Sequence, residues 1–321
     1  MTTNTGTRVP NKQEENKHHG FWYDLFRRLI REKPLGTFGL VIVILLFVVG
    51  IFANFIAPYG MNDIHLIDRL KPPSSTYLLG TDQLGRDLLS RLIYGARVSM
   101  IIGVCATALS EGLATFIGVV SGYLGGKLDM IVQRFVDAWM SIPGFILLMT
   151  VMSIIGSGMM QLIFIIGITA AIGHSRVIRS AVIGIKANMY VSAADAIGCG
   201  PIRTMIRHIL PNVMSVIIIG FTIGMGGAIM QEASLSFLGF GVPPGVPSWG
   251  SMLSNEGRQF MEKAPPLALW PGAALTLVVY GINMFGDSLR DLLDPRLRGG
   301  IGRYSLKEKS VKKLRANLVD R

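Results

Sequence analysis

Residues 190–212, YVSAADAIGCGPIRTMIRHILPN, lie between two long apolar stretches of the chain. The segment is rich in alanine and carries two arginines and a histidine, whereas its flanks hold almost no charge. Half of the 321 residues are hydrophobic, only 16% are charged, and the mean hydropathy is +0.48. These values are typical of an integral membrane protein, so we interpret the segment as a polar connection between two membrane spans.

The flanking stretches are two of six apolar runs. A helix crosses the hydrocarbon core with about 20 mostly apolar residues, and lipid offers no water to satisfy irregular backbone. We therefore expect an all-α integral membrane protein with six transmembrane helices. The expected spans are residues 38–56, 98–124, 138–155, 156–173, 213–230 and 267–284.

The basic residues predict how these spans are oriented. Six spans place both termini on one side, and that side, which includes residues 173–212, holds 24 of the 31 lysines and arginines. By the positive-inside rule, both termini and residues 190–212 are expected in the cytoplasm. The net charge of +11 then reflects topology, and we expect no nucleic-acid partner.

The two ends of the chain differ from the predicted six-span membrane domain at residues 35–298. In the first tail, residues 1–34, apolar residues within 20–33 recur at helical spacing with three arginines between them. This pattern predicts an amphipathic helix on the inner leaflet, in contact with membrane lipid, with a disordered basic tail as the alternative. Residues 299–321 are expected to form a second basic cytoplasmic tail.

The opening segment has the pattern of two short helices joined by a turn. Both halves repeat apolar residues at i, i+3, i+4 and i+7, namely Tyr190, Ala193, Ala194 and Ile197, then Ile202, Met205, Ile206 and Ile209. Glycines in GCGP end the first helix, and Pro201 suits the start of the second. Pro211 is expected to end the second helix. The outward faces are expected to carry Ser192, Asp195, Arg203, Arg207 and His208. An ordinary surface hairpin is the alternative.

SAADAIGCGPIRTMIRHILPN resembles the EAA loop of ABC importer permeases. The matching residues are Ala193, Ala194, Gly198, His208, Leu210 and Pro211. Ser192 stands where the family pattern has glutamate, which puts an acidic contact there in doubt. The resemblance implies that this loop docks into cytoplasmic ATPase subunits. The residues expected to couple to the ATPase are Ser192, Ala193, Ala194, Asp195, Gly198, Arg207, His208 and Pro211.

Three further motifs resemble the peptide/nickel permease family, in particular its dipeptide-permease C-type subunit. They are LLGTDQLGRDLLSRLIYGARVSM at 78–100, QEASLSFLGFGVPPGVPSWGSML at 231–253 and DSLRDLLDPRLR at 287–298. The resemblance covers about residues 35–300 and implies a type I ABC importer permease fold. It also implies a homologous permease subunit, two ATPase subunits and an extracytoplasmic binding protein as partners, with dipeptides or oligopeptides as cargo.

The first two of these motifs lie on the expected outer side and hold candidate contact residues. Asp82 or a neighbour can cap the helix of the second span, and a polar cluster follows it. Either this cluster anchors a helix end, or it belongs to a surface that contacts the binding protein or rearranges as the pore opens. The Gly and Pro content excludes a regular helix over 239–250, where Trp249 is expected to anchor the loop at the membrane interface. The candidates are Asp82, Arg86, Asp87, Arg91 and Trp249.

Glu111 is the carboxylate expected in mid-span. A charged group in the membrane is costly, so it either faces a translocation path, where it could meet the amino end of a peptide, or is hydrogen-bonded between helices. SGYLGGKL at 121–128 lacks the spacing of a phosphate loop, and neither cysteine has metal-site spacing. We expect no catalytic residue, metal or cofactor in this chain, with ATP and magnesium bound by the partner ATPases.

Two alternatives remain open from the sequence. Permeases for nickel chelates or glutathione are similar, although no cluster of Cys and His favours a metal cargo. A stand-alone secondary transporter would instead show inverted repeats and paired broken helices, and it would leave the EAA-like loop unexplained.

Overall fold

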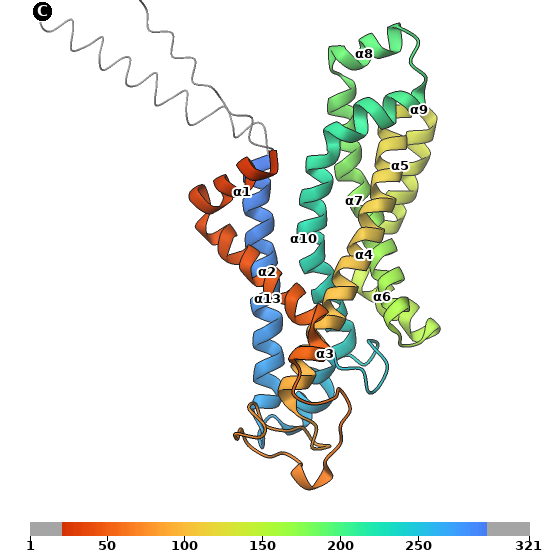
Figure 1. The fold of residues 1–321 in the computed structure, drawn as a ribbon. Helices are drawn as coiled ribbons and strands as arrows, with labels where there is room; N and C mark the ends of the chain where they lie inside the picture. The colour runs from red at the N-terminus through yellow and green to blue at the C-terminus, as the bar shows by residue number, and fades with distance from the viewer. Residues whose placement is uncertain (1–20, 294–321) are drawn as a thin grey trace, which may run out of the picture.

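The computed structural model describes residues 21–293, and this part of the chain is helical without a β-strand (Figure 1). In chain order the elements are α1 (Phe21–Glu32), α2 (Pro34–Ile51), α3 (Ala53–Ile56), η1 (Leu66–Asp68), α4 (Leu88–Leu124), α5 (Gly126–Met140), α6 (Gly144–Ile155), α7 (Met159–Lys186), α8 (Met189–Ala196), α9 (Pro201–Thr204), η2 (Met205–Ile209), α10 (Leu210–Phe237), α11 (Trp249–Ser251), η3 (Met252–Gly257), α12 (Arg258–Phe260) and α13 (Pro266–Leu293). Of the terminal tails expected at 1–34 and 299–321, residues 1–20 and 299–321 lie outside the described residues.

Five helices are long and apolar enough to cross a membrane: α2, α4, α7, the continuous run 201–237 and α13. A sixth crossing is made if α5 and α6 count as one span, since the pair passes the same test together although it bends by 81°. The all-α architecture and the number of spans expected from the sequence are therefore confirmed, with five straight crossings and one broken one.

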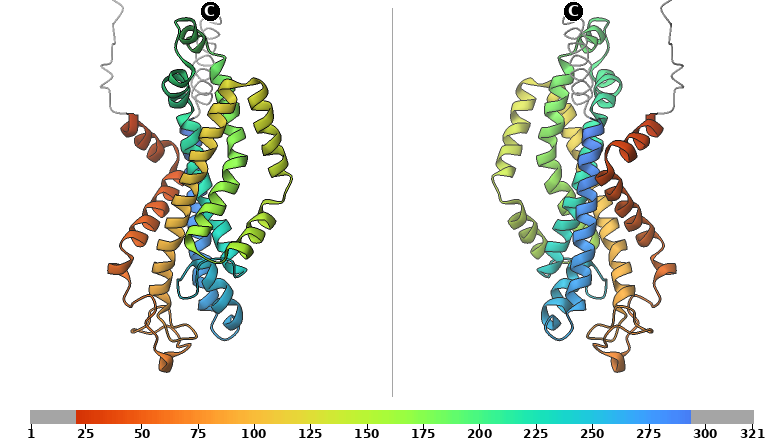
Figure 2. Two further views of the ribbon diagram at one scale, coloured as in Figure 1. Left: turned by 90° about the vertical axis from the view of Figure 1, so that its right-hand side faces the viewer. Right: turned by 90° about the vertical axis from the view of Figure 1, so that its left-hand side faces the viewer.

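The third and fourth expected spans have the wrong bounds. The sequence predicts one span at 138–155, but the chain breaks at Ser141–Pro143 and α5 extends back to Gly126. Pro143 causes the break, because it has no N–H to donate and disfavours a helical residue before it. The fourth helix begins at Met159 and runs to Lys186, thirteen residues past its expected end. Figure 2 shows α5 and α6 bowing away from the bundle.

The spans pack through small residues. A Cβ added at Gly118 of α4 would lie 2.7 Å from the carbonyl oxygen of Ser175 in α7, so these two helices touch backbone to backbone. A Cβ added at Gly39 of α2 would likewise lie 2.3 Å from the carbonyl oxygen of Gly281 in α13. Such close approach is how helices associate in lipid, where burial of apolar surface gives little driving force.

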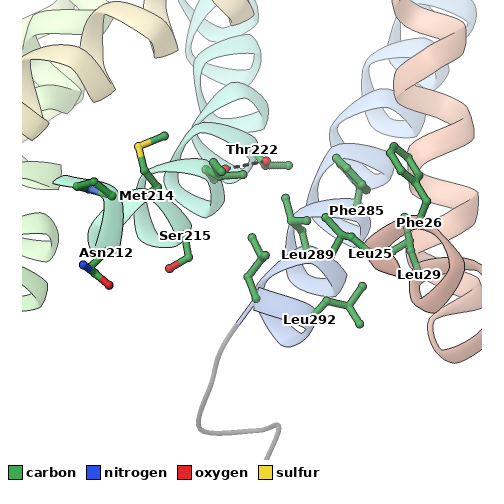
Figure 3. A pocket seen from close by; sticks show the side chains of 13 residues that line it. Leu25, Phe26, Leu29, Asn212, Met214, Ser215, Thr222, Phe285, Leu289 and Leu292 are labelled. Carbon is green, nitrogen blue, oxygen red and sulfur yellow. Dashed lines mark hydrogen bonds between the residues drawn. The ribbon is translucent and has the colours of Figure 1, made fainter. Parts of the chain in front are cut away.

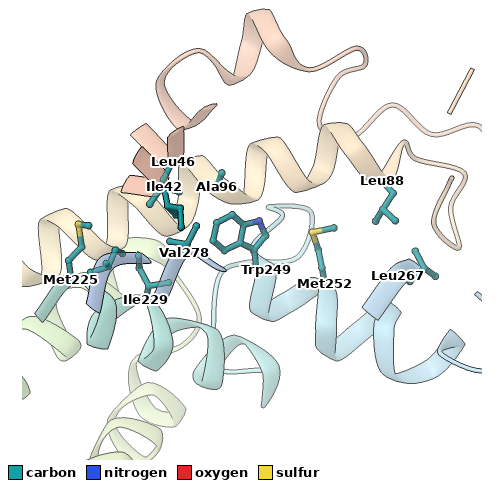
Figure 4. Packing of buried hydrophobic residues seen from close by; sticks show 11 residues of the cluster. Ile42, Leu46, Leu88, Ala96, Met225, Ile229, Trp249, Met252, Leu267 and Val278 are labelled. Atoms are coloured by element: carbon teal, nitrogen blue, oxygen red, sulfur yellow. The ribbon is translucent and has the colours of Figure 1, made fainter. Parts of the chain in front are cut away.

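The molecule has two different ends, which we call the hairpin end and the loop end. The hairpin end holds α1, the start of α10 and the hairpin itself, residues 189–209 (Figure 1). The loop end holds the connections 57–87 and 238–265. Beside the loop end lies an apolar cluster of eleven buried residues, in which Trp249 and Met252 from the second connection meet side chains of α2, α4, α10 and α13 (Figure 4).

Candidate functional sites

The hairpin begins with α8 and turns sharply at Gly198. This glycine has φ +82°, a left-handed conformation that glycine adopts without steric cost. The Cys199 N–H donates to the Ala194 carbonyl at 3.0 Å, which closes the last turn of α8. Pro201 then occupies the first turn of α9. The predicted helix, turn and second helix are therefore present.

The second helix of the hairpin does not end at Pro211, which corrects the sequence-based expectation. It passes through the π-helical turn η2 directly into α10, so 201–237 is one continuous helical run. Pro211 lies in the first turn of α10, and the wider π turn before it accommodates a ring that would clash in a regular helix. The hairpin is thus a rigid extension of a membrane span.

The apolar residues of the hairpin are largely exposed. Ile197 is 82% exposed, and Ile202 and Ile206 of the second helix are 68% and 61% exposed. Met189 and Tyr190 extend the same apolar character along α8. Exposed apolar side chains in this number, at an end of the molecule outside the packed bundle, are typical of a surface that another protein covers.

The buried side of α8 consists of Val191 and Ala194. Asp195 is exposed, as expected, and its carboxylate accepts a hydrogen bond from the Tyr123 hydroxyl, at the end of α4, at 3.1 Å. Thr204 of α9 approaches the same oxygen at 3.5 Å. The carboxylate of Asp195 therefore joins the hairpin to the bundle, a contact that the sequence did not predict.

Tyr123 also connects α4 to α7. Lys186, in the last turn of α7, donates to the Tyr123 carbonyl at 2.6 Å and places its ammonium 5.3 Å from the centre of the ring. Two turns of α7 earlier, Arg179 forms a two-pronged ion pair with Asp129 of α5, at 2.6 and 2.5 Å. The ends of α4, α5 and α7 are thereby fixed to one another beneath the hairpin.

The remaining predicted coupling residues differ in exposure. Ser192, Ala193, Gly198, Arg207 and Pro211 are exposed, and His208 is half-buried. Ala194 is buried beneath α8, so it supports the hairpin and does not form part of its surface.

At the loop end, Asp82 is the centre of a buried ion cluster. Its carboxylate accepts hydrogen bonds from the backbone N–H of Leu84 and of Arg86, and the Arg86 guanidinium donates to it at 2.6 Å. Arg91 lies 3.4 Å from the same carboxylate. Asp82 has no exposed surface, and both arginines are less than a tenth exposed.

Asp87 caps α4, as the sequence suggested for Asp82 or a neighbour. Its carboxylate accepts from the backbone N–H and the hydroxyl of Ser90, at 2.8 and 2.7 Å. Because the whole cluster is buried, these side chains are not themselves an open contact surface for another protein. Their contacts support the alternative interpretation, in which they anchor a helix end and order the connection before it.

Trp249 anchors its loop, although inside the protein and not at the membrane interface. Its indole N–H donates to the Leu92 carbonyl of α4 at 3.1 Å, and the side chain is 3% exposed. A Cβ at Gly95 would lie 2.9 Å from the ring, so the glycine makes room for it. The chain from Gly239 to Ser248 is not helical, as expected, but α11 begins at Trp249 with a Ser248 capping box, inside the range 239–250 that was expected to be irregular.

A second contact in the outer connection involves Asp68 and Tyr77. The Tyr77 hydroxyl donates to the Asp68 carboxylate at 2.7 Å, and Lys71 pairs with the other carboxylate oxygen. The hydrogen bond to Asp68 raises the pKa of Tyr77 to about 12, because the phenolate would face a carboxylate. The hydrogen bond from Lys71, followed by that from Tyr77, lowers the pKa of Asp68.

Glu111 lies between α4, α7 and α10 and is 4% exposed. Its Oε1 is 2.7 Å from His174 Nδ1, on α7. A Cβ at Gly220 of α10 would lie 2.8 Å from the same oxygen, so the carboxylate rests against the α10 backbone. Glu111 and His174 line a cavity of about 520 Å³ that is also bounded by α10 and by the end of α13. Glu111 is therefore hydrogen-bonded between packed helices, which agrees with one of the two sequence-based interpretations, and it also borders a cavity.

Comparison with known proteins identifies the class of this fold. Residues 114–299 match the family described as the binding-protein-dependent transport system inner membrane component, and residues 20–73 match the N-terminal transmembrane domain of oligopeptide transport permease C. The fold is similar to that of the methionine ABC transporter MetNI in inward-facing conformations, with a TM-score of 0.51, 19% identity, and coverage of 64% of this chain and 96% of that chain.

Two relatives narrow the class further. The dipeptide transport system permease protein DppC of Alkalihalophilus pseudofirmus is 36% identical over 86% of this chain and 90% of its own length. The glutathione transport system permease protein GsiD of Escherichia coli is 38% identical, with coverage of 87% and 91%. The chain therefore belongs to the permeases of peptide ABC importers, which are multi-pass proteins of the inner membrane. This membership leaves the secondary-transporter alternative without support.

Several residues with structural contacts at these sites were not selected from the sequence. Tyr123 precedes a glycine pair at a span end, and its link to Asp195 joins positions 72 residues apart. His174 lies in the middle of α7 and Arg290 in the last turn of α13, and only the folded chain brings them to the cavity beside Glu111. A titratable residue within or next to an apolar run is the available sequence signal, and His174 and Arg290 both carry it.

Proposed function

We propose that this chain is the permease subunit through which an ATP-driven importer moves dipeptides or oligopeptides into the cytoplasm. The observation that carries the proposal is identity of 36–38% to dipeptide and glutathione permeases over nearly the whole chain. Glutathione is itself a short peptide, so both relatives support a peptide-like cargo. Glutathione import is the second candidate, because the GsiD relatives match this chain as well as DppC does.

The hairpin is the docking surface for the ATPases in this proposal. Its exposed Ile197, Ile202 and Ile206 would enter an apolar groove of the partner, in the way that short amphipathic helices are recognised. Both termini and the hairpin then lie in the cytoplasm, in agreement with the distribution of lysine and arginine. ATP and magnesium would be bound by the partner ATPases, and this chain would be a non-catalytic subunit without a cofactor of its own.

The other partners follow from the class. A homologous permease subunit would complete the pore as a heterodimer, and an extracytoplasmic binding protein would deliver cargo to the loop end. Closure of the ATPase dimer would push the hairpin, and the Asp195–Tyr123 hydrogen bond would pass the motion to α4 while η2 passes it to α10. Such coupling is rigid movement of packed helices about an interface.

The test is uptake of a labelled dipeptide by the reconstituted complex, measured together with ATP hydrolysis. Ile197→Asp places a charge on the exposed hairpin surface, and we expect dipeptide uptake to fall at least tenfold or the ATPase subunits to dissociate. Ile67→Asp is the matched control, because Ile67 is 96% exposed at the loop end. Normal uptake with Ile197→Asp would show that the hairpin surface is not the ATPase contact.

Gly198→Pro tests the turn independently of the docking surface. Proline cannot adopt the φ of +82° found at Gly198, so the hairpin would lose its turn while the bundle keeps its own contacts. We expect hydrolysis without transport, or loss of the ATPases. Glutathione and a dipeptide compared as competing cargoes in the wild-type complex decide between the two candidate functions.

A further inference from the structure

The cavity beside Glu111 has the composition of a ligand site. Its volume is about 520 Å³, within the range of roughly 300–1,000 Å³ that is common for small-molecule pockets. Most of its wall is apolar, supplied by residues such as Val177, Ile219 and Leu293. The titratable groups are few. Glu111, which is hydrogen-bonded to His174, is acidic, and Arg290 is basic.

The negative end of the cavity is built into the membrane core. Glu111 is more than nine-tenths buried, and its one side-chain hydrogen-bond partner among the described residues is His174. His174 itself is partly exposed to the cavity, with its side chain 40% accessible. A carboxylate in an apolar wall attracts a cation strongly, because little water screens it.

The positive end is Arg290, near the last described residue of α13. Arg290 is exposed and has no ion-pair partner in residues 21–293. Its neighbour Asp291 is paired instead with Lys33, between α1 and α2, at 2.5 Å. Within residues 21–293 the guanidinium is therefore available to a carboxylate, which it can hold with two parallel hydrogen bonds.

The two charged ends of the cavity come from different helices, Glu111 from α4 and Arg290 from α13. Along α10 the wall includes Ser215 and Gly220, and Gly220 lies next to Glu111. Five residues of helix rise about 7.5 Å. An extended chain spans about 3.3 Å per residue, so a peptide of two or three residues matches this length of the wall.

We propose that this cavity is a binding site for the two charged ends of a short peptide, with the ammonium at Glu111 and the carboxylate at Arg290. The apolar wall between them would accept different side chains without selecting among them. His174 holds the Glu111 carboxylate in place before the ammonium arrives. The inference deepens the proposed function, because it rests on peptide import and assigns recognition of the cargo ends to this chain as well as to the binding protein.

The test is direct binding of the dipeptide Ala-Phe to the purified complex of permease and ATPase subunits, without the binding protein. Saturation-transfer NMR detects weak binding, and micelles without protein serve as the blank. We expect transfer to Ala-Phe in the wild type, and about tenfold weaker binding for N-acetyl-Ala-Phe and for Ala-Phe-amide. Glu111→Gln and Arg290→Gln should each weaken Ala-Phe binding about tenfold, whereas Arg134→Gln, on the exposed face of α5, should not change it.

Absence of transfer in the wild type, or equal transfer from free and capped dipeptides, overturns the inference. Loss of binding in only one of the two variants also overturns it, since both charged ends are required. The capped dipeptides act on unaltered protein, so they decide the matter even where a variant fails to fold. Dipeptide uptake by the wild type is measured separately: uptake without binding in this cavity refutes the inference alone, whereas absence of uptake refutes the proposed function.

Discussion

At the loop end, Asp82 has no exposed surface and is held by two arginines and two backbone N–H groups, whereas at the hairpin end Ile197 is 82% exposed. Both regions connect spans. The loop end pairs its buried Asp82 carboxylate within the chain, and Trp249 packs it onto the bundle. The hairpin is joined to the bundle through Asp195, a small buried face and η2.

The difference separates a buried cluster held by contacts within the chain from an apolar helical surface that the chain leaves uncovered. Burial of charges is tolerated only where they are paired and hydrogen-bonded, so the Asp82 cluster specifies one conformation of the outer connection. An exposed apolar surface gains free energy when another protein covers it. We therefore expect substitutions at the loop end to change stability and substitutions at the hairpin to change coupling.

The largest effect on stability is expected for Asp82→Ala. It leaves the Arg86 and Arg91 guanidinium groups buried without their carboxylate, which costs about 3–5 kcal/mol in the free energy of unfolding. The measurement is the midpoint of thermal unfolding of the solubilised chain. Asp291→Ala is the control, because it breaks an exposed ion pair worth about 0–1 kcal/mol. Equal midpoints for the two variants would mean that the loop end is no more self-contained than the surface.

A smaller effect is expected for Gly95→Ala. The added methyl group would lie 2.9 Å from the Trp249 ring, and such overpacking costs about 1–3 kcal/mol. The double variant Gly95→Ala/Trp249→Phe should recover part of that loss, because the smaller ring leaves space for the methyl group. Additive destabilisation in the double-mutant cycle would contradict the contact.

Tyr123→Phe is expected to have a still smaller effect on stability. Loss of one hydrogen bond to Asp195 costs about 0.5–1.5 kcal/mol, and the ring keeps its packing. Amide hydrogen exchange should accelerate in residues 189–197, and dipeptide uptake per ATP hydrolysed should fall severalfold. Tyr190→Phe is the matched control on α8 itself. If exchange in α8 is unchanged in Tyr123→Phe, the hydrogen bond does not fix the hairpin.

The sequence predicted those features that depend on neighbouring residues. Spans follow from local hydropathy, and the acidic cap of α4 depends on a carboxylate three residues before Ser90. The turn of the hairpin could be predicted because Gly198 and Pro201 act on their own backbone.

The contacts that the sequence did not reveal join distant parts of the chain. Glu111 and His174 are 63 residues apart, and no local pattern indicates that α4 and α7 bring them together. Pro211 was expected to end the helix, but the helix continues through it. The clash of a proline ring with the preceding turn is avoided here because that turn widens to a π-helix. Trp249 was expected at the membrane interface. Its burial could not be predicted from neighbouring residues, because it depends on space left by Gly95, 154 positions away.

The smallest expected effect concerns Tyr77 at the loop end, and it tests whether the outer connection keeps its contacts in solution. The pKa of Tyr77, raised to about 12, means that its hydrogen bond to Asp68 stabilises the fold fully below pH 10 and is lost as the pH rises through about 12. At the acid end the sign is opposite. Since the pKa of Asp68 is lowered, its contribution is present above its ordinary value of 3.8 and is lost as the pH falls through the lowered pKa.

The measurement is the tyrosinate absorbance of wild type minus Tyr77→Phe, which isolates one phenol among the eight tyrosines. We expect the difference to titrate near pH 12, and at a lower pH in the Asp68→Asn background, where the Asp68 carboxylate no longer opposes the phenolate. Titration near pH 10 in both backgrounds would mean that the contact is open in solution. The loop end would then resemble the hairpin, because its conformation would also depend on contact with a partner.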